Sequence, residues 1–240
     1  MKTTALVLFF SFGLSLAARS ADAPAPTYQE KNVEGWTLRI NDRLLSENKE
    51  ATDKALVLLT AHLKEIIRVV PADAVTEMRK VTLWWNPEYA SGHPRAEYHP
   101  DASWLRANGR NPAMAKGVEF SNIKSFEAET RRMPCFVLHE LAHSFHDRVL
   151  SFDQPDILAA YKKALESKSY DKVERWHGVT GRPNTIERAY AMTNHKEYFA
   201  EVTEAFFGRN DFFPFTREEL EKHDPEAVKV LQKVWNVPAK

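Results

Sequence analysis

The chain has 240 residues, of which 43% are hydrophobic, and this is enough for one domain with a sizeable core. Its 33 Lys and Arg residues balance its 33 Asp and Glu residues, so the charge indicates neither a nucleic acid nor a membrane surface as a partner. A single cysteine, Cys135, excludes an intramolecular disulfide. We therefore expect a monomer that is stabilised by its core and draws its specificity from a cleft.

The N-terminal residues have the three parts of a signal peptide. Lys2 supplies a positive start, residues 5–18 are apolar apart from Ser and Gly, and small residues follow at a candidate cleavage site. An uncleaved membrane anchor is the alternative, but the apolar run is shorter than the ~20 residues of a spanning helix. We predict a signal peptide over residues 1–20, a tether over residues 21–35, and a secreted or periplasmic protein without stable membrane association.

The first half of the remaining chain alternates helical and extended patterns. Apolar residues recur at helical spacing over residues 41–70, and a β-branched and aromatic run predicts a strand over residues 81–85. Residues 88–112 are rich in Pro and Gly and predict a long structured loop. Residues 116–123 alternate as a strand with one polar face, which is either an ordinary sheet edge or an edge along which an extended peptide lies.

The second half is mainly helical. We predict one helix with Pro134 in its first turn and three helices after it, and a polar loop around Gly178 and Gly181. The predicted helices cover residues 133–150, 155–168, 194–207 and 227–235, and the loop covers residues 170–185.

These patterns predict an α+β fold with a small mixed sheet, an edge strand over a cleft, and a mainly helical C-terminal lobe. We expect one domain over residues 36–240, with an N-lobe over about residues 36–150 and a C-lobe over about residues 151–240.

Residues 139–143 read His-Glu-Leu-Ala-His, the pattern that carries most information about chemistry. On a helix, His139 and His143 share one face, and this spacing suits two imidazole ligands of one Zn²⁺. Glu140 then lies beside the metal as a base for bound water. The residues around them are apolar, so a metal is the natural partner for polar groups that would otherwise be costly to bury.

Two histidines leave a catalytic zinc one protein ligand short. This chain has His146 and Val149 where the metzincin arrangement needs glycine and histidine, so that arrangement is excluded. Glu197 and Glu201, one turn apart on a predicted helix, offer the alternative. Glu197 can reach the metal, and Glu201 can accept the second N–H of a ligating histidine and set its tautomer. The plainer interpretation is that both glutamates belong to a solvated helix face.

These residues resemble the gluzincins, and within them the branch that includes the catalytic domain of anthrax lethal factor and the Pro-Pro endopeptidases. The resemblance covers residues 139–211 and is carried by the His-Glu-Leu-Ala-His pentad, Tyr190, and residues 193–201, which read Thr-Asn-His-Lys-Glu-Tyr-Phe-Ala-Glu. It implies a zincin-like fold and Glu197 as the zinc glutamate. It also implies that Tyr190, seven residues before Glu197, donates a hydrogen bond to the transition state. The alternative for Tyr190 is a packing residue.

We therefore predict a secreted zinc-dependent metalloendopeptidase with Zn²⁺ as its cofactor and a peptide or protein as its substrate. The expected metal ligands are His139, His143 and Glu197. The expected catalytic residues are Glu140 and Tyr190, and Glu201 is expected to accept a hydrogen bond from a ligating histidine. Two alternatives stay open, a zinc hydrolase of a non-peptide amide bond and a silent zinc-stabilised extracellular binding protein.

Some residues near the motif have less defined expectations. For Cys135 the alternatives are a packing residue, a metal ligand or a latency switch. For His146 they are a core residue, or a residue that contacts the substrate or a metal ligand. We expect His177 and His195 at the surface. Residues 208–215 form a further conspicuous segment without an assigned mechanism.

Overall fold

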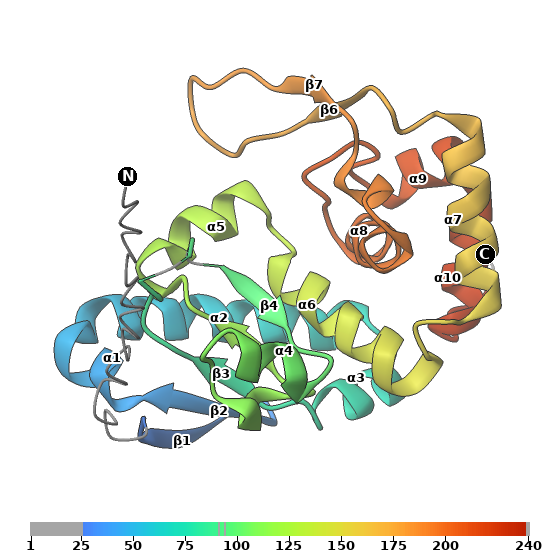
Figure 1. Cartoon of the computed structure of the whole chain (residues 1–240). Coiled ribbons are helices and arrows are strands. Elements are labelled where there is room, and N and C mark those ends of the chain that lie inside the picture. The colour runs from blue at the N-terminus through green and yellow to red at the C-terminus, as the bar shows by residue number, and fades with distance from the viewer. Residues whose placement is uncertain (1–25, 91, 94, 239–240) are drawn as a thin grey trace, which may run out of the picture.

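The computed structural model describes residues 26–90, 92–93 and 95–238, and it has an α+β fold with a small mixed sheet, as predicted (Figure 1). The predicted signal peptide lies outside the described residues. In the part of the chain that is described, the main sheet has the strand order β1-β2-β3-β5-β4. Its strands are β1 (Tyr28–Val33), β2 (Trp36–Asn41), β3 (Leu83–Trp85), β4 (Ala96–Tyr98) and β5 (Val118–Phe120).

The β1–β2 hairpin corrects the described part of the tether predicted over residues 21–35. β1 pairs with β2 in antiparallel register from Tyr28↔Asn41 to Val33↔Trp36, and Glu34 and Gly35 turn the chain with φ of 52° and 96°. Two positive φ values in a two-residue turn match the twist of a hairpin. β1 is polar and mostly exposed, which made it read as a tether, but its backbone completes one edge of the sheet.

The opposite edge of the sheet also differs from the prediction. β5 lies within the predicted strand of residues 116–123, but it pairs in parallel with β3 and in antiparallel with β4, so it is an inner strand. All three of its residues are buried. The edge strand is instead β4, which comes from the stretch predicted as a loop over residues 88–112.

The predicted helices are present, with two interruptions, and four short helices over residues 72–78, 102–107, 126–132 and 217–223 were not predicted. The predicted helix over residues 41–70 breaks at Asn48, and the helix that carries the His-Glu-Leu-Ala-His pentad begins at Phe136, after Pro134, and ends in a π-helical turn. The α-helices are α1 (Asp42–Glu47), α2 (Lys49–Val69), α3 (Ala72–Met78), α4 (Ala102–Ala107), α5 (Phe126–Arg132), α6 (Phe136–Phe145), α7 (Pro155–Ser167), α8 (His195–Phe207), α9 (Arg217–His223) and α10 (Pro225–Val234). The shorter turns are η1 (Pro112–Met114), η2 (Ile123–Ser125), η3 (His146–Leu150, π-helical) and η4 (Tyr190–Met192).

One apolar core runs from the sheet through α6 to the C-terminal helices. On the sheet side, Phe126 and Phe136 pack edge to face at 4.9 Å between ring centroids. On the other side, Trp235 stacks on Phe145 at 4.2 Å and on Phe199 at 5.7 Å. Because α6 lies between β4 and α8, residues on its opposite faces meet different parts of the chain (Figure 1).

A second, two-stranded sheet encloses most of the loop predicted over residues 170–185. β6 (Val173–Arg175) pairs in antiparallel with β7 (Thr185–Glu187), and the segment between them extends above α5 (Figure 1). Gly178 in this segment has φ of 63°, and a Cβ atom there would lie 2.1 Å from the carbonyl oxygen of Arg131. The hairpin therefore contacts α5 at a position that admits only glycine.

A search of the described helices for a segment that is long and apolar enough to cross a membrane finds none.

Candidate metal centre

α6 places His139 and His143 one turn apart on a buried helix face. Their side chains lie between apolar neighbours, since Val137, Leu141 and Ala142 are fully buried. Both histidine residues are themselves less than 10% exposed. The helix period that buries the apolar residues therefore also directs both imidazoles toward α8.

α8 brings Glu197 to the same point. Asn194 caps this helix, and its side-chain oxygen accepts hydrogen bonds from the backbone N–H groups of Lys196 and Glu197. Burial of Tyr198 and Phe199 then fixes the rotation of α8 against the core. Glu197 lies in the first turn, on the face that meets α6.

The three side chains converge on one point. Nε2 of His139, Nε2 of His143 and Oε2 of Glu197 are each 3.1 Å from the other two. In a tetrahedral zinc site with bonds of about 2.0–2.1 Å, ligand atoms lie about 3.3 Å apart. Nitrogen and oxygen donors at this spacing fit a zinc ion.

The charges in this cluster support one another. Burial raises the pKa of the Glu197 carboxyl, but hydrogen bonds with His139 and His143 outweigh this effect and bring the pKa below its ordinary value. Burial lowers the pKa of His139, but its carboxylate partners, Glu197 first, bring it well above its ordinary value. The ionised Glu197 carboxylate suits a cation, and a metal that binds here displaces a proton from His139, because a ligating imidazole must be neutral.

The hydrogen bond behind His139 corrects the role predicted for Glu201. Nδ1 of His139 lies 2.7 Å from Oε1 of Glu204, whereas the nearest Glu201 oxygen is 3.9 Å away. Glu201 instead accepts a hydrogen bond of 3.2 Å from Nδ2 of Asn210. The sequence carries a signal for Glu204, because it lies seven residues after Glu197 and so on the same helix face.

Glu140 and Tyr190 both lie beside the three converging atoms. The Glu140 carboxylate accepts a hydrogen bond of 2.8 Å from the backbone N–H of Tyr98 in β4. Tyr190 lies in η4 with 45% of its surface exposed, and its ring centroid is 6.4 Å from that of His139. Burial, followed by the charge of Glu197, raises the pKa of Tyr190, so its hydroxyl keeps its proton and can donate it in a hydrogen bond.

Two cavities of about 310 Å³ each open on this group of residues. Both are lined by His139, Glu140, Tyr190 and residues of β4. One extends between α5 and β6, and the other extends past His143 toward Phe152. The candidate centre therefore has space on both sides for a substrate.

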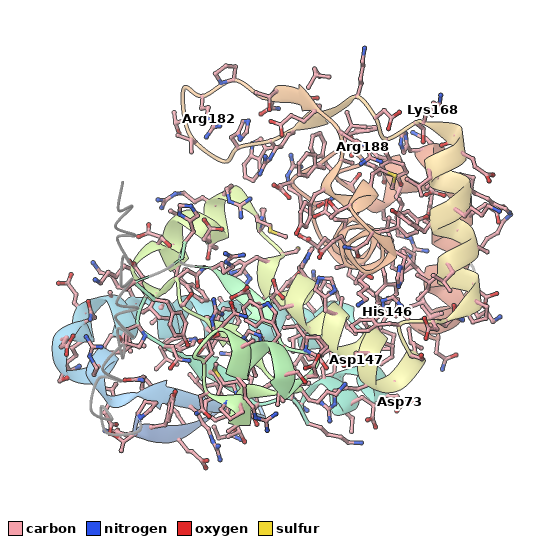
Figure 2. The ribbon with its side chains drawn as sticks, viewed as in Figure 1. Asp73, His146, Asp147, Lys168, Arg182 and Arg188 are labelled. Carbon is pink, nitrogen blue, oxygen red and sulfur yellow. The ribbon has the colours of Figure 1, made fainter. Side chains whose placement is uncertain are left out.

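The remaining histidines and the cysteine lie apart from the three converging atoms. His146 is fully buried against Phe199, at the end of α6 marked in Figure 2, and neither of its ring nitrogens has a partner among the described residues. His177, expected at the surface, is 4% exposed and lies 2.9 Å from the Thr185 hydroxyl. Burial raises the pKa of the Cys135 thiol to about 12, which disfavours a thiolate ligand.

A second group of charged residues was not anticipated from the sequence. Glu119 in β5 is 1% exposed and lies within 2.8 Å of Nε2 of His99 and 3.0 Å of Nη1 of Arg110. The side chains of Asn86 and Tyr89 also donate to it. Because its carboxylate already has four partners, this group is a closed network that holds the long segment before β5 against the sheet.

Comparison of the chain with models of protein families, with curated proteins and with solved structures finds no match.

Proposed function

We propose that the protein is an exported zinc-dependent metalloendopeptidase of the gluzincin type, with a zincin-like fold. The convergence of His139, His143 and Glu197 within 3.1 Å of one another carries the proposal. It is supported by Glu140, which follows His139 on α6 and lines both cavities with it. A carboxylate beside a metal position can act as the base for a metal-bound water.

In this proposal His139, His143 and Glu197 hold the zinc. When bound, zinc supplies a Lewis acid and makes a coordinated water more acidic. Glu140 accepts the proton of the attacking water and returns it to the nitrogen of the leaving amine. The Tyr98 N–H keeps the Glu140 carboxylate in place through the hydrogen bond of 2.8 Å.

Tyr190 acts on the carbonyl oxygen of the bond that is cleaved. Tyr190 lies in η4, which contacts α8, and it lines both cavities. As the carbonyl becomes tetrahedral its oxygen gains negative charge, and a fixed donor stabilises that charge more than it stabilises the ground state.

The free edge of β4 favours a peptide as the substrate. In antiparallel pairing, alternate residues direct their backbone groups to opposite sides. The bonds Ser121 N–H to Arg95 C=O and His99 N–H to Gly117 C=O place Arg95, Glu97 and His99 on the side of β5. The Ala96 backbone groups and the Tyr98 carbonyl then face the cavities, where an extended peptide can add as a further strand.

The test is digestion of a diverse peptide library by the mature protein loaded with Zn²⁺, followed by mass spectrometry. Parallel reactions contain the Glu140→Ala variant and the wild type with a chelator. Cleavage that both controls abolish supports the proposal and reveals the sites of cleavage. A folded, zinc-loaded protein that cleaves no peptide would contradict it, and activity on non-peptide amides would then separate the other hydrolase from a silent binding protein.

A further inference from the structure

The segment of residues 208–215 links the candidate centre to one of its cavities. Asn210 donates to Glu201 on α8, and the next residue, Asp211, is 1% exposed. The Asp211 backbone carbonyl accepts from Trp176 N–H at 2.8 Å, and Phe212 forms a β-bridge with Arg175. The segment therefore joins α8 to the β6–β7 hairpin.

Asp211 places two arginines at the end of the cavity. Its Oδ2 atom lies 3.3 Å from Nη1 of Arg132 on α5 and 3.6 Å from Nε of Arg175 on β6. The guanidinium of Arg175 also lies 4.7 Å from the centroid of the Phe212 ring. Both arginines and Asp211 line the same cavity as His139 and Glu140.

These two arginines have three carboxylate partners, of which only Asp211 is buried. Asp211 is shared between them, and each has one further carboxylate, Glu129 at 2.6 Å from Arg132 and Glu187 at 3.1 Å from Arg175. The Glu129 and Glu187 side chains are 28% and 37% exposed, so water screens both ion pairs. The Nε atom of Arg175 is buried without a hydrogen-bond partner among the described residues.

The rim of the cavity adds a third cation. Arg95, the residue before β4, lines the same cavity, and its half-exposed side chain lies 3.6 Å from Glu97. The cavity is lined by these three arginines and by four carboxylates, those of Glu129, Glu140, Glu201 and Asp211. Each guanidinium has five N–H donors, more than its ion pairs use, and its planar shape favours a carboxylate as a further acceptor.

We propose that Arg132 and Arg175, oriented by Asp211, form a subsite that binds a carboxylate of the substrate next to the bond that is cleaved. The carboxylate comes from an acidic side chain or from the C-terminus of the peptide. The assignment of a cleaved peptide bond rests on the proposed function above, whereas the anion subsite rests on the arginines alone.

The experiment compares pairs of peptides that differ by Glu or Gln at each position around the cleavage site, with a free or an amidated C-terminus. We expect the zinc-loaded wild type to prefer the acidic member of one pair by roughly ten- to a hundredfold in kcat/KM, the range for a charged hydrogen bond. Preference for Glu over Gln assigns the subsite to a side chain, and preference for the free over the amidated terminus assigns it to the C-terminus.

Variants then show whether Arg175 causes the preference for the acidic peptide. Arg175→Gln should reduce it about tenfold or more, mainly through KM for the acidic peptide, and Arg175→Lys should restore part of it. Arg188→Gln is the matched control, because Arg188 follows β7, away from the tip marked by Arg182, and pairs with Asp171 (Figure 2). An unchanged preference in Arg175→Gln, or no preference in the wild type, would overturn the subsite.

A peptide-binding experiment distinguishes failure of the arginine subsite from failure of the proposed function. The zinc-loaded Glu140→Gln variant, immobilised, is incubated with the same peptides, and the retained peptides are identified with and without Arg175→Gln. Retention of acidic peptides that depends on Arg175, without cleavage by the wild type, would leave the subsite standing and contradict the peptidase. Cleavage by the wild type, without Arg175-dependent retention of acidic peptides and without a preference for them, would support the peptidase and overturn the subsite.

Discussion

The Nδ1 atom of His139 lies 2.7 Å from the Oε1 atom of Glu204, and this pair links α6 to α8 behind the candidate metal centre. Both side chains are almost completely buried, so the carboxylate determines which ring nitrogen of His139 carries the proton. Nε2, the nitrogen that faces His143 and Glu197, is thereby left free to bind a metal.

Replacement of Glu204 by Ala should weaken zinc binding about 10–100-fold, the usual cost of losing such a partner. Glu204→Gln should weaken it less, because its amide oxygen still accepts from Nδ1. Glu201→Gln is the matched control, since Glu201 lies 3.9 Å from the same nitrogen. Competition with a chromophoric chelator measures all three, and a larger effect of Glu201→Gln than of Glu204→Ala would show that this geometry does not govern metal affinity.

Replacement of Tyr190 by Phe should lower kcat by roughly 10²–10³, because the hydroxyl is the donor proposed for the developing oxyanion. Zinc content should stay close to that of the wild type, since the Tyr190 ring only lies beside His139 at 6.4 Å. Steady-state kinetics and metal analysis of the same preparation decide the outcome. Parallel loss of zinc and activity would assign Tyr190 to packing.

Gly178→Ala should destabilise the hairpin contact with α5. The new Cβ would lie 2.1 Å from the Arg131 carbonyl oxygen, in addition to the strain of φ at 63°. Gly181→Ala is the matched control, because Gly181 has φ of 81° but no atom within 4 Å of its Cβ position. We expect Tm to fall by several degrees more for Gly178→Ala, a difference that corresponds to at least about 1 kcal/mol. Equal shifts would mean that backbone strain alone matters.

Stability should fall with pH between about 6.5 and 4 because of His62. Burial against Phe126 and Phe136 lowers the pKa of His62 to about 4, while the unfolded chain titrates near its ordinary 6.5. The stabilisation of the neutral form is fully present above pH 6.5 and is lost as the pH falls toward 4. At 1.36 kcal/mol per pKa unit the loss is no more than about 3 kcal/mol.

Urea unfolding of the wild type and His62→Gln at pH 7.5 and 4.5 measures this contribution as the difference between their pH dependences. The glutamine keeps a polar group near the Thr130 hydroxyl, which lies 3.1 Å from Nε2 of His62. We expect the variant to lose less stability on acidification. Identical losses in the two proteins would contradict the assignment to His62.

Regular periods in the sequence predicted the longer helices, the strands β3 and β5, and part of the candidate centre. The helix period predicts that His139 and His143 share a face, and the Asn cap with the buried aromatic residues after it predicts the helix that carries Glu197. These inferences succeed because each depends on residues a few positions apart along one element. The strand at residues 83–85 was recognisable for the same reason.

Packing between distant segments decided the rest. Helix period alone does not choose between Glu201 and Glu204, because both lie on one face of α8 and the angle between α6 and α8 selects the partner of His139. The edge position of β4 depends on long-range pairing with β5, which a three-residue strand within a proline-rich segment does not reveal. Likewise, only the folded chain places Arg132 and Arg175 on either side of Asp211, because α5, β6 and the end of α8 meet there through contacts that no local period encodes.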